Sequence, residues 1–213
     1  GGSKRLPNKN ILPLNGKPMI VHTINAAKKA RLTNEIWVCT DDNVIEDIAT
    51  ENEVNVYKIP KSMAEDDVSS TVPCLSLVQY LSSKNKNFKY LFNLQPTSPL
   101  RNSEDITLSF QKLINGNFNF LVSITDIDPH YFHWAMKKKN EKWRMYFETK
   151  YLKERIYLEK VYRPNGAIKL ALLDELILTG NFFGKKLGVH VMPEKRSIHI
   201  GNQFDFTCAK SFF

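Results

Sequence analysis

The first ten residues combine groups that could bind phosphate. They include two glycines, one hydroxyl and three cationic side chains: Gly1, Gly2, Ser3, Lys4, Arg5 and Lys9. Glycine lets backbone N–H groups approach phosphate oxygens closely, and lysine or arginine neutralises their charge. The Gly-Lys-Ser/Thr ending of the Walker motif is absent. The stretch predicts a phosphate cradle, although a basic, glycine-rich stretch is also typical of an unstructured tail.

Two further polar side chains are candidates for binding a second substrate. Gln95 follows the apolar run 90–94, which places it at the carboxyl end of a predicted strand, where open α/β sheets bind ligands. A turn-forming amide before Pro96 is the alternative. Arg163 precedes the predicted turn 164–166, which would present a planar, bidentate donor to a carboxylate or phosphate. The alternative for Arg163 is an ordinary surface ion pair.

The elements that must position these groups alternate between strands and helices. Apolar runs predict strands over 35–40, 54–59, 90–94, 120–124, 167–173 and 187–192. Helical spacing predicts helices over 18–27, 44–49 and 71–81, one from Ser103, and a short one after Asp205. Such alternation implies right-handed crossovers and a mainly parallel sheet between helices. The fold class is therefore α/β, and 213 residues suit a single domain, 1–213.

The pattern breaks between 126 and 161, which we interpret as an insertion. It is rich in aromatic side chains, namely Tyr131, Phe132, Trp134, Trp143, Tyr146 and Phe147. Aromatic side chains contribute large buried areas at subunit interfaces, so the insertion predicts a dimerisation surface. Packing of these side chains on their own sheet is the alternative.

Composition limits the other classes of function. Thirty Lys and Arg against 22 Asp and Glu give a net charge of +8, which acidic ligands, nucleic acid or a solvated basic surface could explain. The basic residues are scattered and no nucleic-acid recognition motif accompanies them, so we expect no nucleic-acid partner. Three distant cysteines form no disulfide framework and fit a reducing cytoplasm. The sequence contains no run of about twenty apolar residues, so it predicts no membrane span.

Three motifs in order resemble one enzyme family. The opening stretch continues as Asn10-Ile11-Leu12-Pro13-Leu14-Asn15-Gly16-Lys17-Pro18-Met19-Ile20, and is followed by Leu94-Gln95-Pro96-Thr97-Ser98-Pro99-Leu100-Arg101 and Arg163-Pro164-Asn165-Gly166-Ala167-Ile168. Together they closely resemble the acylneuraminate cytidylyltransferases, which are the CMP-sialic acid synthetases and their bacterial relatives acting on legionaminic or pseudaminic acid. The turn 40–42 and the segment 66–70 also fall where that family has equivalents.

The resemblance implies a three-layer, Rossmann-like nucleotidyltransferase fold and a homodimer. It also implies a reaction in which the anomeric hydroxyl of an acidic nine-carbon sugar attacks the α-phosphorus of CTP and expels pyrophosphate. Positioning and charge neutralisation dominate such transfers, and no nucleophilic side chain is needed. The alternatives are a pseudoenzyme that binds CTP or the sugar, and an enzyme for eight-carbon ulosonic acids, which the motif 163–166 disfavours.

The resemblance also assigns residues. Those implied to bind the nucleotide are Gly2, Ser3, Lys4, Lys9, Asn10, Ser69 and Ser70, of which Lys4 and Lys9 would also serve catalysis. Those implied to bind the sugar are Gln95, Arg101, Arg163 and Asn165, with Arg101 in a minor role.

Two departures from the family pattern concern the metal and the first strand. The family holds catalytic Mg²⁺ with an Asp-Ile-Asp motif, where this chain has His199 and Gly201. Only the later acid, Asp205, remains, and we expect it to cap the last helix. The family signature is also normally preceded by a hydrophobic strand ending in Ala-Arg. Neither is present, so we expect the sheet to lack its first central strand and the sequence to be truncated.

Overall fold

The computed structural model describes residues 5–65, 67–147 and 152–213. Its helices are α1 (Met19–Ala30), α2 (Asn43–Glu51), α3 (Thr71–Ser83), α4 (Ser103–Asn115), α5 (Pro129–His133), α6 (Leu173–Thr179) and α7 (Gln203–Lys210). Its strands are β1 (Pro13–Leu14), β2 (Lys17–Pro18), β3 (Trp37–Thr40), β4 (Asn55–Lys58), β5 (Tyr90–Asn93), β6 (Phe120–Ile127), β7 (Met136–Lys139), β8 (Lys142–Met145), β9 (Val161–Leu172) and β10 (Leu187–Val191).

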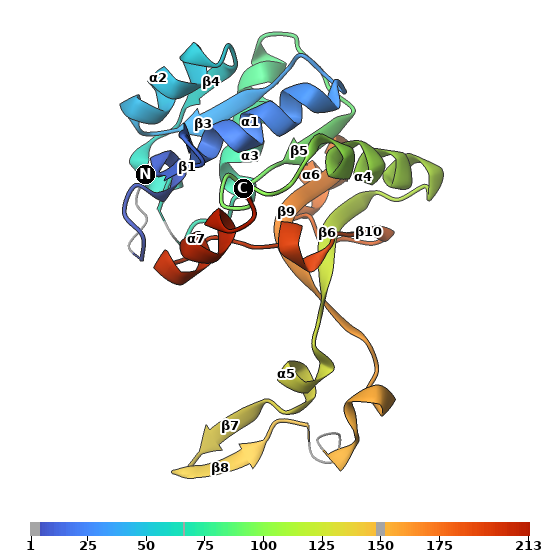
Figure 1. Ribbon diagram of the computed structural model, residues 1–213. Helices are drawn as coiled ribbons and strands as arrows, with labels where there is room; N and C mark the ends of the chain where they lie inside the picture. Colours follow the sequence, from blue (N-terminus) through green and yellow to red (C-terminus); the bar gives the residue numbers. More distant parts are fainter. Residues whose placement is uncertain (1–4, 66, 148–151) are drawn as a thin grey trace.

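The central sheet has the strand order β10-β6-β9-β5. β10 is parallel to β6, and β9 is antiparallel to both β6 and β5, so three of the four strands run in the same direction. β3 and β4 form a separate parallel pair. Helix α4 packs against the central sheet, α2 packs on β3 and β4, and α1 contacts α4 (Figure 1). The predicted α/β class with a mainly parallel sheet is confirmed.

The helices begin where the sequence provides caps. Asp42 accepts hydrogen bonds from the backbone N–H groups of Val44 and Ile45 at the start of α2. Asn102 and Asp105 form a reciprocal capping box at the start of α4. These side chains satisfy donors that the first helical turn leaves without partners. The boundaries predicted for α2 and the start predicted for α4 are accordingly close to the observed ones.

A gap separates β3 from β5. Within the described ranges no strand pairs with both, and a cavity of about 650 Å³ opens between them. Its walls include apolar side chains of α1, β3, α3 and β5, such as Ile24, Val38, Leu77 and Phe92.

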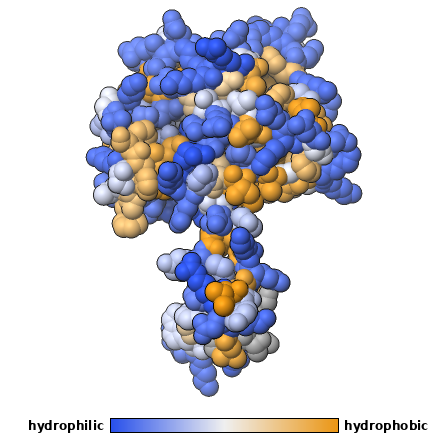
Figure 2. All heavy atoms as spheres, turned by 45° about the vertical axis from the view of Figure 1, so that its right-hand side comes forward, coloured by the Kyte–Doolittle hydropathy of each residue, from blue (hydrophilic) through white to orange (hydrophobic). Residues whose placement is uncertain are grey.

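The segment between β6 and β9 projects from the body of the protein (Figure 1). The two strands continue outward as a pair, and α5, β7 and β8 lie at the far end. Hydrophobic side chains are visible on the surface of this projecting arm, residues 128–160 (Figure 2). Tyr131 is 83% exposed and Trp143 is 64% exposed, so neither packs only on its own sheet. The dimerisation surface stays a prediction.

Four features differ from the sequence-based expectations. Helix α6 and the β7–β8 ribbon were not predicted. The last helix begins at Gln203 instead of after Asp205, because Asp205 occupies the third position of its first turn. The expected turn at 164–166 lies inside strand β9, where it forms an irregularity in the pairing with β6.

Candidate functional site

The irregularity in β9 shapes the site. The pairing between β6 and β9 shifts between Val122 and Ile124, and the extra β9 residues form a bulge at 165–168. Gly166 in this bulge has φ +74°, a conformation that side-chain-bearing residues rarely adopt. Bulges re-aim side chains and are common beside active sites. The motif that we expected to form a turn therefore forms a bulge within a strand.

Gln95 and His199 meet in front of this bulge. A Cβ atom added to Gly166 would lie 3.1 Å from Gln95 Oε1 and 3.2 Å from His199 Nδ1. His199 Nδ1 also lies 3.3 Å from Thr97 Oγ1, within hydrogen-bond distance. Glycine at 166 thus fits both the backbone conformation and the close approach of the two side chains. Gln95 lies just beyond the carboxyl end of β5, as predicted.

Asn165 lies behind the bulge and is only 1% exposed. Its Oδ1 accepts hydrogen bonds from Ser123 Oγ at 2.5 Å and from the Ala167 N–H at 3.1 Å. Its Nδ2 donates to Ser197 Oγ at 2.9 Å. These bonds replace ladder bonds that the bulge disrupts. The prediction that Asn165 contacts the sugar is corrected: its polar atoms are engaged inside the protein, and it positions the bulge.

Arg101 is also enclosed, at 2% exposure. Its Nη1 donates to the Ala167 carbonyl at 2.5 Å, and its Nη2 donates to Thr23 Oγ1 at 2.7 Å. Burial lowers the pKa of Arg101 to about 10. We predicted a minor substrate-binding role, but the guanidinium faces the protein interior. Arg101 therefore ties α1 to the bulge and does not line the site.

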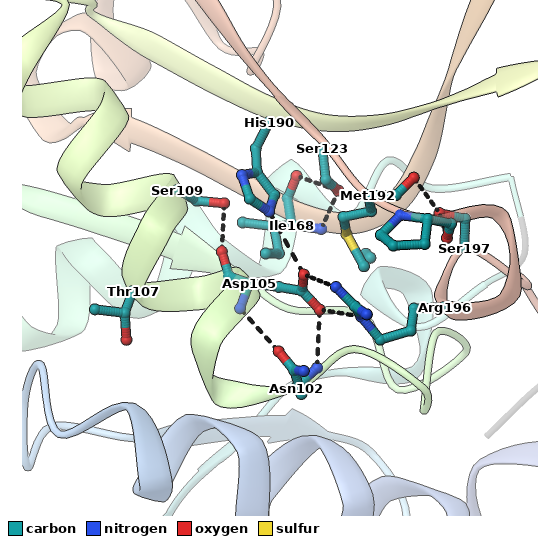
Figure 3. Close-up of polar contacts among 12 residues, drawn as sticks. Asn102, Asp105, Thr107, Ser109, Ser123, Ile168, His190, Met192, Arg196 and Ser197 are labelled. Atoms are coloured by element: carbon teal, nitrogen blue, oxygen red, sulfur yellow. Dashed lines mark hydrogen bonds and ion pairs between the residues drawn. The ribbon is translucent and has the colours of Figure 1, made fainter.

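A buried ion pair anchors the segment that carries His199 (Figure 3). Arg196 donates to both carboxylate oxygens of Asp105, at 2.9 and 3.1 Å, and His190 Nε2 lies 3.5 Å from the same carboxylate. Burial alone would raise the pKa of Asp105, but the nearby His190 and the hydrogen bonds from Arg196 and the Asn102 N–H lower it to about 2. The carboxylate therefore stays charged and joins α4 to β10 and to the segment that leads to His199.

The first five of the residues predicted to bind the nucleotide lie near the start of the chain. Gly2, Ser3 and Lys4 lie outside the described residues. Lys9 and Asn10 line the cavity, and Asn10 Oδ1 is buried without a hydrogen-bond partner in the described part of the chain. Such an acceptor suits a ligand that donates a hydrogen bond.

The two serines before α3 have different surroundings. Ser69 Oγ accepts a 3.3 Å hydrogen bond from the Thr71 N–H and so helps to begin α3. Ser70 lines the cavity, and its Oγ accepts hydrogen bonds from Asn93 Nδ2 at 3.1 Å and from Lys169 Nζ at 3.2 Å. Ser70 therefore faces the cavity and Lys169, whereas Ser69 serves the start of α3.

Lys169 lies beside Ser70, although we did not single it out in the sequence. It lies on β9 directly opposite Asn93 of β5, and burial lowers the pKa of its ammonium group. The signal in the sequence is a single lysine within the apolar run 167–172. A charged side chain within a buried strand is rare without a partner or a ligand.

Positive charge dominates around His199. Burial lowers the pKa of His199, and the nearby charges of Lys9, Arg163 and Lys169 lower it further, opposed by Asp205. Arg163 is exposed on β9, where it can reach an anionic ligand. A surface with this charge balance attracts anions such as phosphates and carboxylates.

The residues at the family's metal position do not form a site for Mg²⁺. Asp205 Oδ2 accepts hydrogen bonds from the backbone N–H groups of Gly201 and Asn202, at 2.8 and 3.2 Å, as the predicted helix cap. His199 is a poor ligand for a hard cation, and Gly201 has no side chain. The described residues contain no cluster of three potential metal ligands. The donor set therefore does not fit the ion.

His22 on α1 contacts the chain just before that helix, since its Nε2 lies 2.8 Å from the Leu14 carbonyl oxygen. No helix in the described ranges is long and apolar enough to cross a membrane.

An α/β fold with cationic side chains near the carboxyl ends of its sheet strands is typical of enzymes that bind nucleotides, the nucleotidyltransferases among them. Comparison with known proteins places it more narrowly, because the cytidylyltransferase family profile matches residues 1–167. The chain belongs to the cytidylyltransferase family.

Individual relatives agree with this assignment. The chain is 26% identical, over its whole length and 92% of the relative's, to a pseudaminic acid cytidylyltransferase of Campylobacter jejuni. It is 31% identical to a CMP-N,N'-diacetyllegionaminic acid synthase of Legionella pneumophila, over 86% of this chain and 79% of that protein. Among solved structures, CMP:2-keto-3-deoxy-manno-octonic acid synthetase complexed with CTP has the same fold, with a TM-score of 0.70, 16% identity, and 99% and 93% of the two chains covered.

Proposed function

We propose that this protein transfers the CMP group of CTP to the anomeric hydroxyl of a sialic-acid-like nonulosonic acid and releases pyrophosphate. The sugar oxygen would attack the α-phosphorus, and the bond from that phosphorus to the oxygen bridging to the β-phosphate would break. The observation that carries the proposal is the meeting of Gln95, Gly166 and His199 beside Ser70 and Lys9, in a member of the cytidylyltransferase family.

The charges and polar groups fit the two substrates. Lys9 and Ser70 lie on the side that the motifs assign to the nucleotide, and an exposed Arg163 can receive the carboxylate of an acidic sugar. Gln95 lines the same cavity as Lys9 and Ser70 and approaches Gly166, where the sugar hydroxyl would meet the phosphate. Catalysis by this arrangement rests on orientation and charge neutralisation, which fixed side chains can supply.

One assay tests the proposal. Pyrophosphate release would be measured with CTP and, in turn, N-acetylneuraminic, legionaminic and pseudaminic acid, and with the eight-carbon 2-keto-3-deoxy-manno-octonic acid as a control. We expect turnover with at least one nine-carbon sugar and none with the control. Turnover with only the eight-carbon sugar would reject the substrate class, and UTP or ATP in place of CTP checks the base.

A pseudoenzyme is a second candidate because a specific observation favours it. The two aspartates that hold metal in the family are replaced by His199 and Gly201, and Asp205 is engaged as a helix cap. Magnesium would then accompany the phosphates of CTP and water ligands instead of protein carboxylates. CTP binding without any pyrophosphate release across a wide range of Mg²⁺ concentrations would favour the pseudoenzyme.

We further propose a homodimer assembled through the projecting arm, in the cytoplasm. The supporting observation is an arm whose aromatic side chains are largely exposed in a single chain, which is rare unless a partner covers them. Cytoplasmic CTP and three cysteines that are free in the structure suit a reducing compartment. Light scattering at micromolar concentration tests the dimer, and a monomer would reject it.

A further inference from the structure

Lys169 is a half-buried cation with no acidic partner in the described part of the chain. Its Nζ donates to Ser70 Oγ at 3.2 Å and lies 6.0 Å from the centre of the Phe182 ring. No ion pair joins it to a carboxylate of the described residues. Withdrawing an ammonium group from water is costly, and a neutral hydroxyl compensates for only part of that cost. A cation whose charge has no acidic partner favours the binding of an anionic ligand.

The position of Lys169 identifies which anion. Ser70 and Asn93 lie on one side of it, at the polar end of the cavity that also holds Asn10. Gly166 lies on the same strand as Lys169 and approaches Gln95 and His199, and His199 is close enough for the Lys169 charge to lower the pKa of the imidazole. In the proposed function Ser70 serves the nucleotide and Gln95 serves the sugar. Lys169 therefore lies next to residues of both proposed binding sites.

We propose that Lys169 binds a non-bridging oxygen of the α-phosphate of CTP and holds this phosphate in line for attack. The proposal rests on the proposed function, and it makes Lys169 a catalytic residue that the motifs do not mark. A magnesium ion held by carboxylates would place positive charge near the reacting phosphorus. In this chain the side chain of Lys169, which is fixed in the central sheet, would supply that charge. Ser70 and Asn93 orient the ammonium group in the absence of the nucleotide.

Nucleotide fragments separate this role from its alternatives. Binding of cytidine, CMP and CTP would be measured by isothermal titration calorimetry in EDTA, for the parent and for Lys169→Met. We expect Lys169→Met to weaken both CMP and CTP by about 10- to 100-fold, the usual effect of losing a hydrogen bond to a charged group, and to leave cytidine unchanged. Lys169→Arg should recover part of the affinity because it restores the charge.

A matched control and a stability measurement guard against loss of structure. Lys84, at the C-terminal end of α3, is exposed, and its Nζ lies 5.9 Å from the centre of the Tyr80 ring. Lys84→Met should therefore bind all three ligands as the parent does. Because Lys169 lacks an acidic partner, Lys169→Met should melt at the same temperature as the parent or higher, but CMP should raise its melting temperature less.

The outcomes distinguish the proposals. If the parent binds none of the three ligands and CTP gives no turnover, the proposed function fails. If the parent binds CMP and Lys169→Met binds it equally well, the α-phosphate contact is rejected. Weaker binding of CTP with unchanged CMP would place Lys169 at the β- or γ-phosphate, and a raised KM for the sugar alone would place it at the sugar carboxylate; both would overturn the inference. A lower melting temperature with unchanged affinities would make Lys169 a purely structural residue.

Discussion

Restoring two carboxylates at positions 199 and 201 should create a magnesium site that the parent lacks. The structure permits the change. Gly201 does not adopt positive φ, and a Cβ there would lie 3.4 Å from Asp205 Oδ2 and 4.0 Å from Arg5 Nη2, which are ordinary contacts. His199→Asp with Gly201→Asp would bring two new carboxylates beside Asp205, whose Oδ2 already accepts two backbone hydrogen bonds. Hard oxygen ligands in this number suit Mg²⁺.

The size of the effect follows from charge and linkage. Two carboxylates about 4 Å apart repel each other by roughly 4 kcal/mol at the effective dielectric constant of a protein surface, before Arg5 and Lys9 offset part of it. The double variant should therefore be less stable than the parent without metal. At 100 times its Kd, Mg²⁺ should stabilise the variant by about 2.7 kcal/mol, which for a chain of this length raises Tm by roughly 5 to 11 °C.

Two measurements test this prediction. Thermal unfolding is followed during a Mg²⁺ titration, with and without CTP, and pyrophosphate release is measured over the same concentrations. We expect the parent to be slow and to need high Mg²⁺, and the double variant to need less and to turn over faster. The uncharged pair His199→Asn and Gly201→Asn is the control. Identical magnesium curves for parent and double variant would refute the reasoning, because the cation would then bind elsewhere.

Three further predictions concern the phosphate side, the arm and the buried ion pair. Lys9→Ala should lower kcat/KM, because it removes about 2 to 4 kcal/mol of transition-state stabilisation, and should change Tm little. An unaltered rate of pyrophosphate release would remove Lys9 from the mechanism. Tyr131→Ser with Trp143→Ser should convert a dimer to a monomer in light scattering without changing the fold seen by circular dichroism; a persistent dimer would place the interface elsewhere. Asp105→Asn should lower the unfolding free energy by about 3 to 5 kcal/mol, because it leaves His190 and Arg196 without their buried partner. Since the folded pKa of Asp105 is about 2, below the usual value of about 3.9, its contribution is present above pH about 4 and is lost as pH falls towards 2. Urea unfolding at pH 7 and pH 3 should show a smaller pH effect in the variant, and an equal effect would contradict the assignment.

The periodic parts of the chain were predictable because local patterns determine them. Helices α1 to α4 combine apolar residues three or four apart with caps such as Asp42 and Asn102, and the strands between them are short apolar runs. Helix α6 was missed because it follows β9 directly within one leucine-rich run. In such a run, periodicity alone does not show where a buried strand ends and a short helix begins.

The bulge could not be predicted from local pattern. Pro164, Asn165 and Gly166 are typical turn residues, and a turn was the natural expectation. What keeps this segment within a strand is tertiary: Ser123 and Ser197 bind the Asn165 side chain, from 42 and 32 residues away along the chain. The side-chain hydrogen bonds substitute for missing ladder bonds, and no rule of local propensity contains them.

The candidate site was predicted in part for the same reason. Gln95 was found because its place depends only on the end of one strand. Lys169 was missed because its significance depends on Ser70, 99 residues earlier, and on the absence of an acidic neighbour in space. Arg101 and Asn165 were assigned to substrate because sequence motifs do not tell a side chain that faces a ligand from one that holds the ligand-binding backbone in place.

The bulge in β9 links these two kinds of residue. Its inner side is held by Arg101 and Asn165, and its outer side presents Gly166 to Gln95 and His199. A change on the inner side would therefore move the outer side without touching a substrate, and positional errors of about 1 Å are costly in catalysis by orientation. This explains why a single short motif contains a surface cation, a buried amide and a glycine. In the proposed function each would support the same transfer from a different side of one strand.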